Sequence, residues 1–184
     1  MSYPRRIKVA ASIQERVRSR QETRRTIVLD PVVDSHDRLR ERLLDELRRR
    51  GFLEQADGAL ERRRGNALER VDPQTLVATS AIESETTIVG AREDFVDTKE
   101  SVPLARARME ANIREGGTAY FERELSARVE AAGAEMEREL NEAIARVYVE
   151  AVREKAATLG EVASVREDRA GSELVLQITV KVSD

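Results

Sequence analysis

Apolar residues alternate with mostly polar ones near the start of the chain. In RRIKVAASIQERV, every second position is apolar, namely Ile7, Val9, Ala11 and Ile13. A period of two is typical of a half-buried strand. Residues 27–29 form a second apolar run, which Asp30 and Pro31 should end. The polar segment between the two runs, residues 18–25, is therefore expected to be a long hairpin loop.

The segment DSHDRLRERLLDELRRRGF changes to the spacing of an amphipathic helix. Its apolar face contains Leu39, Leu43, Leu44 and Leu47. Asp34 or Ser35 is the expected N-cap, and Gly51 follows the helix as its C′ residue. Phe52 is expected to fold back on the apolar face. His36, in the first turn, is interpreted as a solvated residue, since the chain has no second His or Cys to complete a metal site.

The middle and the end of the chain return to strand patterns. Gly65-Asn66 predicts a tight hairpin turn and Asp72-Pro73 begins another. Between residues 75 and 85 two sets of residues alternate, and the more polar set is expected to face outward; the sets are Leu76, Ala78, Ser80 and Ile82, and Val77, Thr79 and Ala81. Residues 91–103 are expected to form a loop. Residues 161–184 predict a β-hairpin with its turn at 170–171, whose second arm alternates Leu174, Leu176, Ile178, Val180 and Val182. We expect this arm to pair inside the main sheet.

A helical pattern runs from about residue 102 to 159, and Gly116-Gly117 predicts either a break or a kink in it. Its apolar or small residues follow repeated steps of four, four and three: Phe121, Leu125, Val129, Ala132, Met136, Leu140, Ala143, Val147 and Ala151. This eleven-residue period matches a nearly straight helix. Residues 118–159 would span roughly 60 Å, which is more than a small sheet needs.

The apolar arc of this helix widens after residue 144, so that end should pack on the sheet. The thinner part either pairs with residues 102–115 as a helical hairpin or meets another copy. Because residues 102–115 are few, we expect a homo-oligomer. The predicted interface consists of Phe121, Leu125, Val129, Met136 and Leu140.

These elements predict an α+β protein with a mostly antiparallel sheet of about six strands, one short packed helix, one long and partly projecting helix, and a C-terminal β-hairpin. Residues 1–100 form the β-β-α-β meander half, and residues 101–160 the helical segment. Residues 161–184 are expected to complete the same sheet. The chain is thus interpreted as one domain with a helical appendage.

Composition narrows the functional class. Charged residues make up 36% of the chain and aromatic residues 3%, which is typical of a compact core with an extended, solvated element. The absence of cysteine excludes disulfides and a cysteine nucleophile and fits a reducing cytoplasm. There is no signal-like apolar run and no apolar span of membrane length. We expect a cytoplasmic protein.

Charge supplies a second hypothesis, a nucleic-acid-binding module, because the first 70 residues carry an excess of basic side chains. The predicted polyanion contacts are Arg5, Arg6, Lys8, Arg16, Arg18, Arg20, Arg24 and Arg25. The scarcity of aromatic residues for base stacking, and a pI near 5.5, favour an acidic protein partner instead.

No pattern in the chain indicates catalysis. Gly116-Gly117 lacks the lysine and the preceding strand of a phosphate-binding loop. The carboxylates of the long helix alternate with arginines at the spacing of surface ion pairs, as in Glu124–Arg128 and Glu142–Arg146. General acid–base catalysis needs carboxylates with shifted pKa values. We expect no catalytic residue, no cofactor and no metal, and hence no enzyme.

The order of elements resembles a known family. The segments RIKVAASIQERVRSR, LLDELRRRGF and KAATLGEVASVREDRAGSELVLQITVKV are similar in layout to the small partner components of bacterial FtsH–MoxR–vWA ternary systems. This resemblance implies a structural or adaptor protein acting beside an AAA+ ATPase or a vWA-type protein. A small domain followed by a long charged helix is also similar to the band-7 (SPFH) scaffold proteins. We expect a scaffold or adaptor that self-assembles through its long helix.

Overall fold

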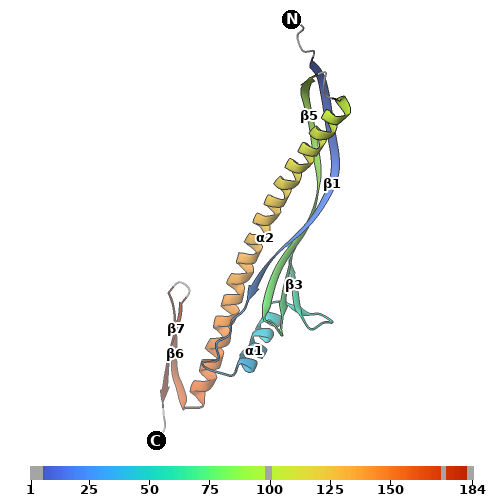
Figure 1. Ribbon diagram of the computed structural model, residues 1–184. Coiled ribbons are helices and arrows are strands. Elements are labelled where there is room, and N and C mark those ends of the chain that lie inside the picture. The colour runs from blue at the N-terminus through green and yellow to red at the C-terminus, as the bar shows by residue number, and fades with distance from the viewer. Residues whose placement is uncertain (1–5, 98–100, 171–172, 182–184) are drawn as a thin grey trace. The chain divides into compact units, whose positions relative to one another are not determined.

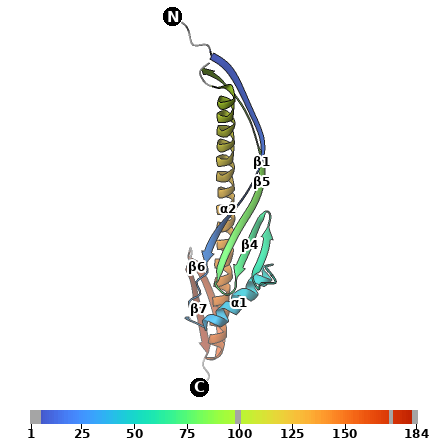
Figure 2. The ribbon, with the colours of Figure 1, turned by 45° about the vertical axis from the view of Figure 1, so that its right-hand side comes forward.

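The computed structural model describes residues 6–97, 101–170 and 173–181. In chain order, the elements are β1 (Arg6–Thr26), α1 (His36–Arg49), β2 (Leu53–Glu54), β3 (Leu60–Arg64), β4 (Ala67–Asp72), β5 (Val77–Asp97), α2 (Val102–Ala157), β6 (Glu161–Ala170) and β7 (Glu173–Lys181). The first five strands form one sheet in the order β1-β5-β4-β3-β2, and Figures 1 and 2 show β1 and β5 running side by side. The predicted α+β class is confirmed.

The chain divides into two compact units that differ from the segments expected from the sequence. Unit 1 combines Met1–Glu22 with Ala81–Ala131, and unit 2 combines Thr23–Ser80 with Ala132–Asp184. Each unit therefore contains part of β1 and part of α2. The division arises because these two elements are much longer than the strands and helices of an ordinary domain.

Unit 1 is built on a two-stranded ribbon of β1 and β5. Three ion pairs cross it: Lys8–Glu93 at 2.5 Å, Arg16–Glu85 at 2.7 Å and Arg18–Glu83 at 2.5 Å. Each step forward along β1 is matched by an equal step back along β5, so the antiparallel register is constant. All six side chains lie on the exposed face of the ribbon.

The other face of the ribbon is covered by α2. Val9 and Ala11 are buried with Val96 of β5 and with Ala105 and Met109 of the helix. Further along β1, half-buried and exposed residues alternate from residue 13 to residue 23. This alternation shows that residues 18–25 belong to the strand, so the predicted hairpin loop is wrong. The half-buried positions within residues 18–25 are polar, namely Ser19, Gln21 and Thr23, so this part of the strand lacks an apolar alternation.

The two central glycines do not interrupt α2, which runs unbroken for 56 residues. A Cβ at Gly117 would lie 2.5 Å from Ile88 Cγ2, whereas one at Gly116 would meet nothing within 4 Å. The predicted break is therefore wrong, and so is the helical hairpin that it would have allowed. Gly117 serves instead as a point of close approach between helix and strand.

Unit 2 contains the larger core. Leu39, Leu43 and Leu47 of α1 are fully buried and pack in one cluster with Met136 and Val147 of α2. The predicted eleven-residue stripe of α2 is confirmed as the buried face of the helix, since eight of its nine residues are buried and Ala132 is half-buried. The stripe is buried by its own chain.

Local signals in unit 2 behave as the sequence predicts. Ser35 is the N-cap of α1 and its Oγ accepts a hydrogen bond from the Arg38 amide. Gly51 has a φ of 91° at the C-terminal end, and Phe52 returns to the core. β3 and β4 pair with Arg64 opposite Ala67, which confirms the tight turn at residues 65–66.

The last two strands form a sheet of their own. β6 and β7 pair antiparallel from Glu161–Lys181 to Ala170–Glu173. Among the described residues this sheet has two strands. The predicted hairpin is confirmed, but the expectation that it extends the main sheet is wrong. Val182, the end of the predicted alternation, lies outside the described residues.

Candidate functional site

The segment that follows β1 presents two valines to solvent from a fixed backbone. Ile27 and Leu29 are buried at 7% and 4% exposure, whereas Val28 and Val32 are 77% and 72% exposed. A single exposed valine is ordinary on a protein surface. Two of them on one short segment that is anchored on both sides form a candidate contact surface.

Two elements hold this segment in place. The Ile27 amide donates a 2.8 Å hydrogen bond to the Leu76 carbonyl, in a turn where Leu76 adopts a φ of 54°. The Tyr148 hydroxyl of α2 accepts from the Asp30 amide at 2.5 Å and donates to the Asp30 carbonyl at 2.9 Å. One phenol thus satisfies both backbone groups of Asp30, and Val28 lies between the two anchors.

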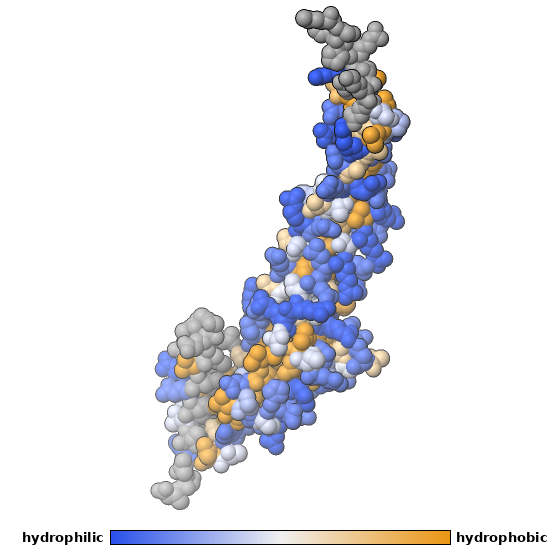
Figure 3. Space-filling model, viewed as in Figure 1, coloured by the Kyte–Doolittle hydropathy of each residue, from blue (hydrophilic) through white to orange (hydrophobic). Residues whose placement is uncertain are grey.

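A groove of about 500 Å³ lies between this segment and α2. We call it the β1-end groove; it is lined by Arg25, Thr26, Ile27, Val28, Glu137, Leu140, Asn141 and Ile144. Its apolar lining comes from Ile27, Val28, Leu140 and Ile144. The Arg25–Glu137 ion pair supplies charges of both signs, and Asn141 adds an exposed amide. Figure 3 shows hydrophobic residues gathered on the viewed face near the end of β1.

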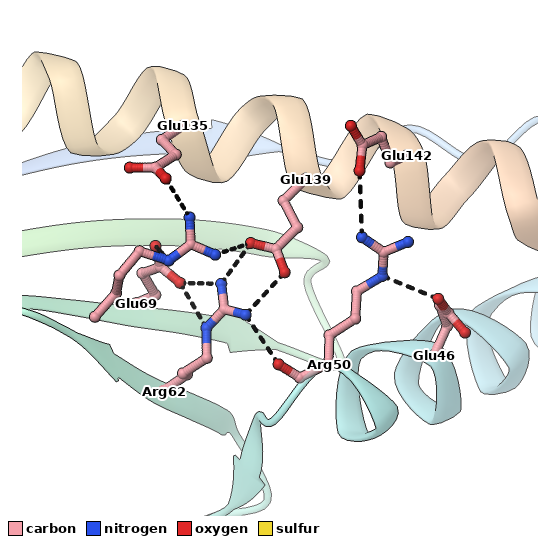
Figure 4. A network of polar contacts seen from close by, with 8 residues as sticks. Glu46, Arg50, Arg62, Glu69, Glu135, Glu139 and Glu142 are labelled. Atoms are coloured by element: carbon pink, nitrogen blue, oxygen red, sulfur yellow. Dashed lines mark hydrogen bonds and ion pairs between the residues drawn. The ribbon is translucent and has the colours of Figure 1, made fainter.

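A network of charged side chains around the buried Glu69 braces α2 against β3 and β4 (Figure 4). The Arg62 guanidinium donates to both Glu139 oxygens at 2.8 and 2.7 Å and to Glu69 at 2.5 and 2.9 Å. It also donates to the Arg50 carbonyl at 2.9 Å and lies 4.4 Å from the centre of the Phe52 ring. All five N–H donors of this guanidinium are therefore engaged.

The electrostatics of the network fit a role in holding the structure together. Hydrogen bonds from Arg62 lower the pKa of Glu139 from 4.5 to about 2, against the opposing effect of burial. The pKa of Arg62 is raised, first by its bonds to Glu139. A carboxylate with this pKa stays ionised near neutral pH and is a poor proton donor there. The network fixes α2, and with it the helix side of the β1-end groove.

The five residues predicted to form an oligomer interface are buried within the single chain. Their exposed fractions are 8% or less: Phe121, Leu125, Val129, Met136 and Leu140. The first three belong to unit 1 and the last two to unit 2. The interface prediction is corrected on this point, because the stripe is covered by the chain's own strands and α1. Of the five, Leu140 lines the β1-end groove.

The basic residues of the second hypothesis are mostly engaged with carboxylates. Lys8, Arg16 and Arg18 pair across the ribbon with β5, while Arg20 lies 3.7 Å from Glu22. Arg25 pairs with Glu137, and Arg24 lines a small pocket with Arg70 and Asp72. Arg6 begins β1 and is exposed. Arg5 lies outside the described residues.

Two further features concern other classes of site. Among the described residues, no group of three or more His, Asp or Glu side chains is placed to hold a metal ion. His36 is exposed at the start of α1, as expected. Within the same part of the chain, neither helix is long and apolar enough to cross a membrane.

Sequence reasoning missed Val28 and Val32 as surface residues. The segment IVLDPVV is apolar on both sides of Asp30-Pro31, and a run of this composition is normally read as buried strand. The available signal was the proline: a chain that must leave the sheet at Pro31 cannot bury every neighbouring apolar residue.

The fold is a small α+β protein with an internally braced long helix and a groove of mixed polar and apolar lining at the end of its first strand. Residues 1–182 match the family model of the FtsH ternary system domain X5 (fvmX5). The chain therefore belongs to this family, and the resemblance to a component of such systems is confirmed. Comparison with curated proteins and with solved structures gave no match to either.

Proposed function

We propose that the chain is a non-enzymatic adaptor of its FtsH ternary system, and that the β1-end groove binds an apolar segment of the AAA+ ATPase partner. The family assigns the chain to an FtsH ternary system, and the proposed partner is the ATPase of that system. The observation that carries the proposal is the pair of exposed valines on a backbone held by Tyr148 and Leu76. A fixed apolar surface loses little conformational entropy when it is bound.

The chemistry of the groove defines the segment that it would accept. Leu140 and Ile144 offer an apolar wall for one or two small side chains, and Arg25 and Glu137 can orient polar neighbours on either side. A groove of about 500 Å³ accommodates a short helical or extended segment. We therefore expect a partner segment with aliphatic anchors flanked by polar residues.

Binding of the purified ATPase to the immobilised full-length chain tests the proposal. Val28→Asp should weaken binding at least about tenfold, because it places a charge at an apolar contact. Val89→Asp is the matched control, since Val89 is 73% exposed and belongs to unit 1. Both variants should fold like the wild type, because neither valine is buried.

Two results would overturn the proposal. One is equal ATPase binding by Val28→Asp and the wild type. The other is a wild-type chain that binds no ATPase but binds the vWA-type protein of the system with the same Val28 dependence. The second result would mean that the groove is a binding site, but for the vWA-type protein and not for the ATPase.

A further inference from the structure

The hairpin of β6 and β7 has two very different edges. Its strands pair only with each other in the part of the chain that the structure describes. β6 carries four consecutive charged residues, 166–169, whereas β7 is uncharged from residue 174 to residue 180. Charged residues protect an open strand edge from pairing with another strand. β6 is protected in this way and β7 is not.

The outer edge of β7, uncharged from residue 174 to residue 180, is suited to pairing with another strand. An isolated two-stranded hairpin is only marginally stable in water. The described side chains on one face of β7, at residues 175, 177, 179 and 181, are all exposed, and Val175 reaches 53%. A third strand on this edge would satisfy the outer backbone groups of β7 and extend the sheet.

We propose that this edge binds β7 of a second copy of the chain, antiparallel and centred on Gln177. β7 runs from Glu173 to Lys181, so Gln177 is its middle residue. Centring on Gln177 pairs the whole strand and puts Glu173 of each copy opposite Lys181 of the other. Val175 then lies opposite Thr179 of the second copy, and Gln177 lies opposite itself.

The register follows from the sequence of the strand. Opposite charges directly across a strand pair are stabilising, and this arrangement supplies one such pair at each end. A slip of one residue in the pairing register would place the odd-numbered residues of one copy on the same face as the even-numbered residues of the other. A shift of the centre by two residues would separate Glu173 from Lys181. β7 is thus complementary to itself in one register, which favours a second copy over an unrelated strand.

The absence of cysteine in the sequence makes this register directly measurable. Gln177→Cys places two thiols across the two-fold axis, with Cα atoms about 4.5–5.5 Å apart, within reach of a disulfide. In Val175→Cys, the two cysteines of the dimer lie four residues apart along the strands, or about 13 Å. The same holds for Thr179→Cys. A mixture of these last two variants places a thiol of one opposite a thiol of the other.

The experiment oxidises each full-length variant, without any partner protein, and resolves the products on a non-reducing gel. We expect a disulfide-linked dimer from Gln177→Cys, little from either Val175→Cys or Thr179→Cys alone, and a dimer from their mixture. A Gln177→Cys chain that stays monomeric would overturn the proposal. Equal cross-linking by all three single variants would also overturn it, since that pattern reports random collision.

A charge exchange gives an independent readout by light scattering of the same chain. Lys181→Glu should weaken self-association about tenfold, and adding Glu173→Lys should restore it. Within the hairpin Lys181 pairs in register with Glu161, and the double variant does not restore the opposite charges at these two positions. Restoration therefore reports the contact between copies, and its absence contradicts the proposed register. Failure of this dimer leaves the ATPase proposal intact, because that proposal rests on the β1-end groove.

Discussion

Gly117 of α2 lies so close to Ile88 of β5 that a Cβ at the glycine would be 2.5 Å from Ile88 Cγ2. Real Cβ atoms essentially never approach another atom this closely. The glycine therefore sets the distance between helix and ribbon in unit 1, and its neighbour Gly116, with open space around it, provides a matched comparison.

Alanine substitutions at the two glycines should act in opposite directions. Gly116→Ala should stabilise the protein by about 1 kcal/mol, because alanine is the better helix former. Gly117→Ala gains the same propensity but forces Ile88 to move, and overpacking typically costs about 1–3 kcal/mol. We expect a net loss of about 1 kcal/mol by urea unfolding. Equal stabilisation by both variants would contradict the close packing.

Removing the arginine at the centre of the charge network should be strongly destabilising. Arg62→Met leaves Glu69, which is 1% exposed, without its closest cation. Breaking one side of a buried ion pair costs about 3–5 kcal/mol. Arg63→Met is the control, because Arg63 is exposed on the same strand, and it should change stability by less than about 0.5 kcal/mol. Similar unfolding midpoints for the two variants would show that the network contributes little.

The Glu139 carboxylate predicts an acid-sensitive step in stability. Its pKa falls from 4.5 to about 2 on folding, so its contribution is complete above about pH 4.5 and is lost as the pH falls through about 2. Unfolding curves between pH 7 and pH 2 should show this loss in the wild type and a smaller loss in Glu139→Gln. Parallel pH profiles would contradict the shifted pKa.

The ion pairs of the ribbon should weaken the binding of DNA and RNA, because they neutralise its basic side chains. Glu83 and Glu85 partner Arg18 and Arg16, and the pKa of Glu83 is lowered by its bond to Arg18. We expect the wild type to bind DNA and RNA weakly, and the double change Glu83→Gln and Glu85→Gln to increase salt-dependent binding. Fluorescence anisotropy at several salt concentrations measures both. Tight wild-type binding with a steep salt dependence would restore the nucleic-acid hypothesis.

Elements whose local chemistry is self-sufficient were predictable from the sequence. The leucines of α1, its Ser35 cap and Gly51 specify that helix without reference to the rest of the chain, and the turn at residues 65–66 does the same for β3 and β4. The eleven-residue stripe of α2 also identified its buried face. These signals depend on periods and caps that a short window contains.

Features that depend on long-range partners were not predictable. Residues 18–25 look like a loop until β5 supplies Glu83 as the partner of Arg18. Gln21 and Thr23 also lie against α2, at Glu122 and Gly133. Gly117 looks like a helix break until Ile88 is beside it. Leu140 was identified from the sequence as an interface residue, but the neighbouring Val28 was not, because only the fold shows that its side chain is exposed.

Hydrogen exchange of the full-length chain, with and without the purified ATPase, tests the central claim most directly. The groove proposal predicts slower exchange for the amides of Val28 and Val32 and for the facing turn of α2 around Leu140. It predicts no change along the exposed face of the ribbon near Val89. Unchanged exchange at Val28 and Val32 in the presence of saturating ATPase, with protection elsewhere, would contradict the proposed adaptor surface.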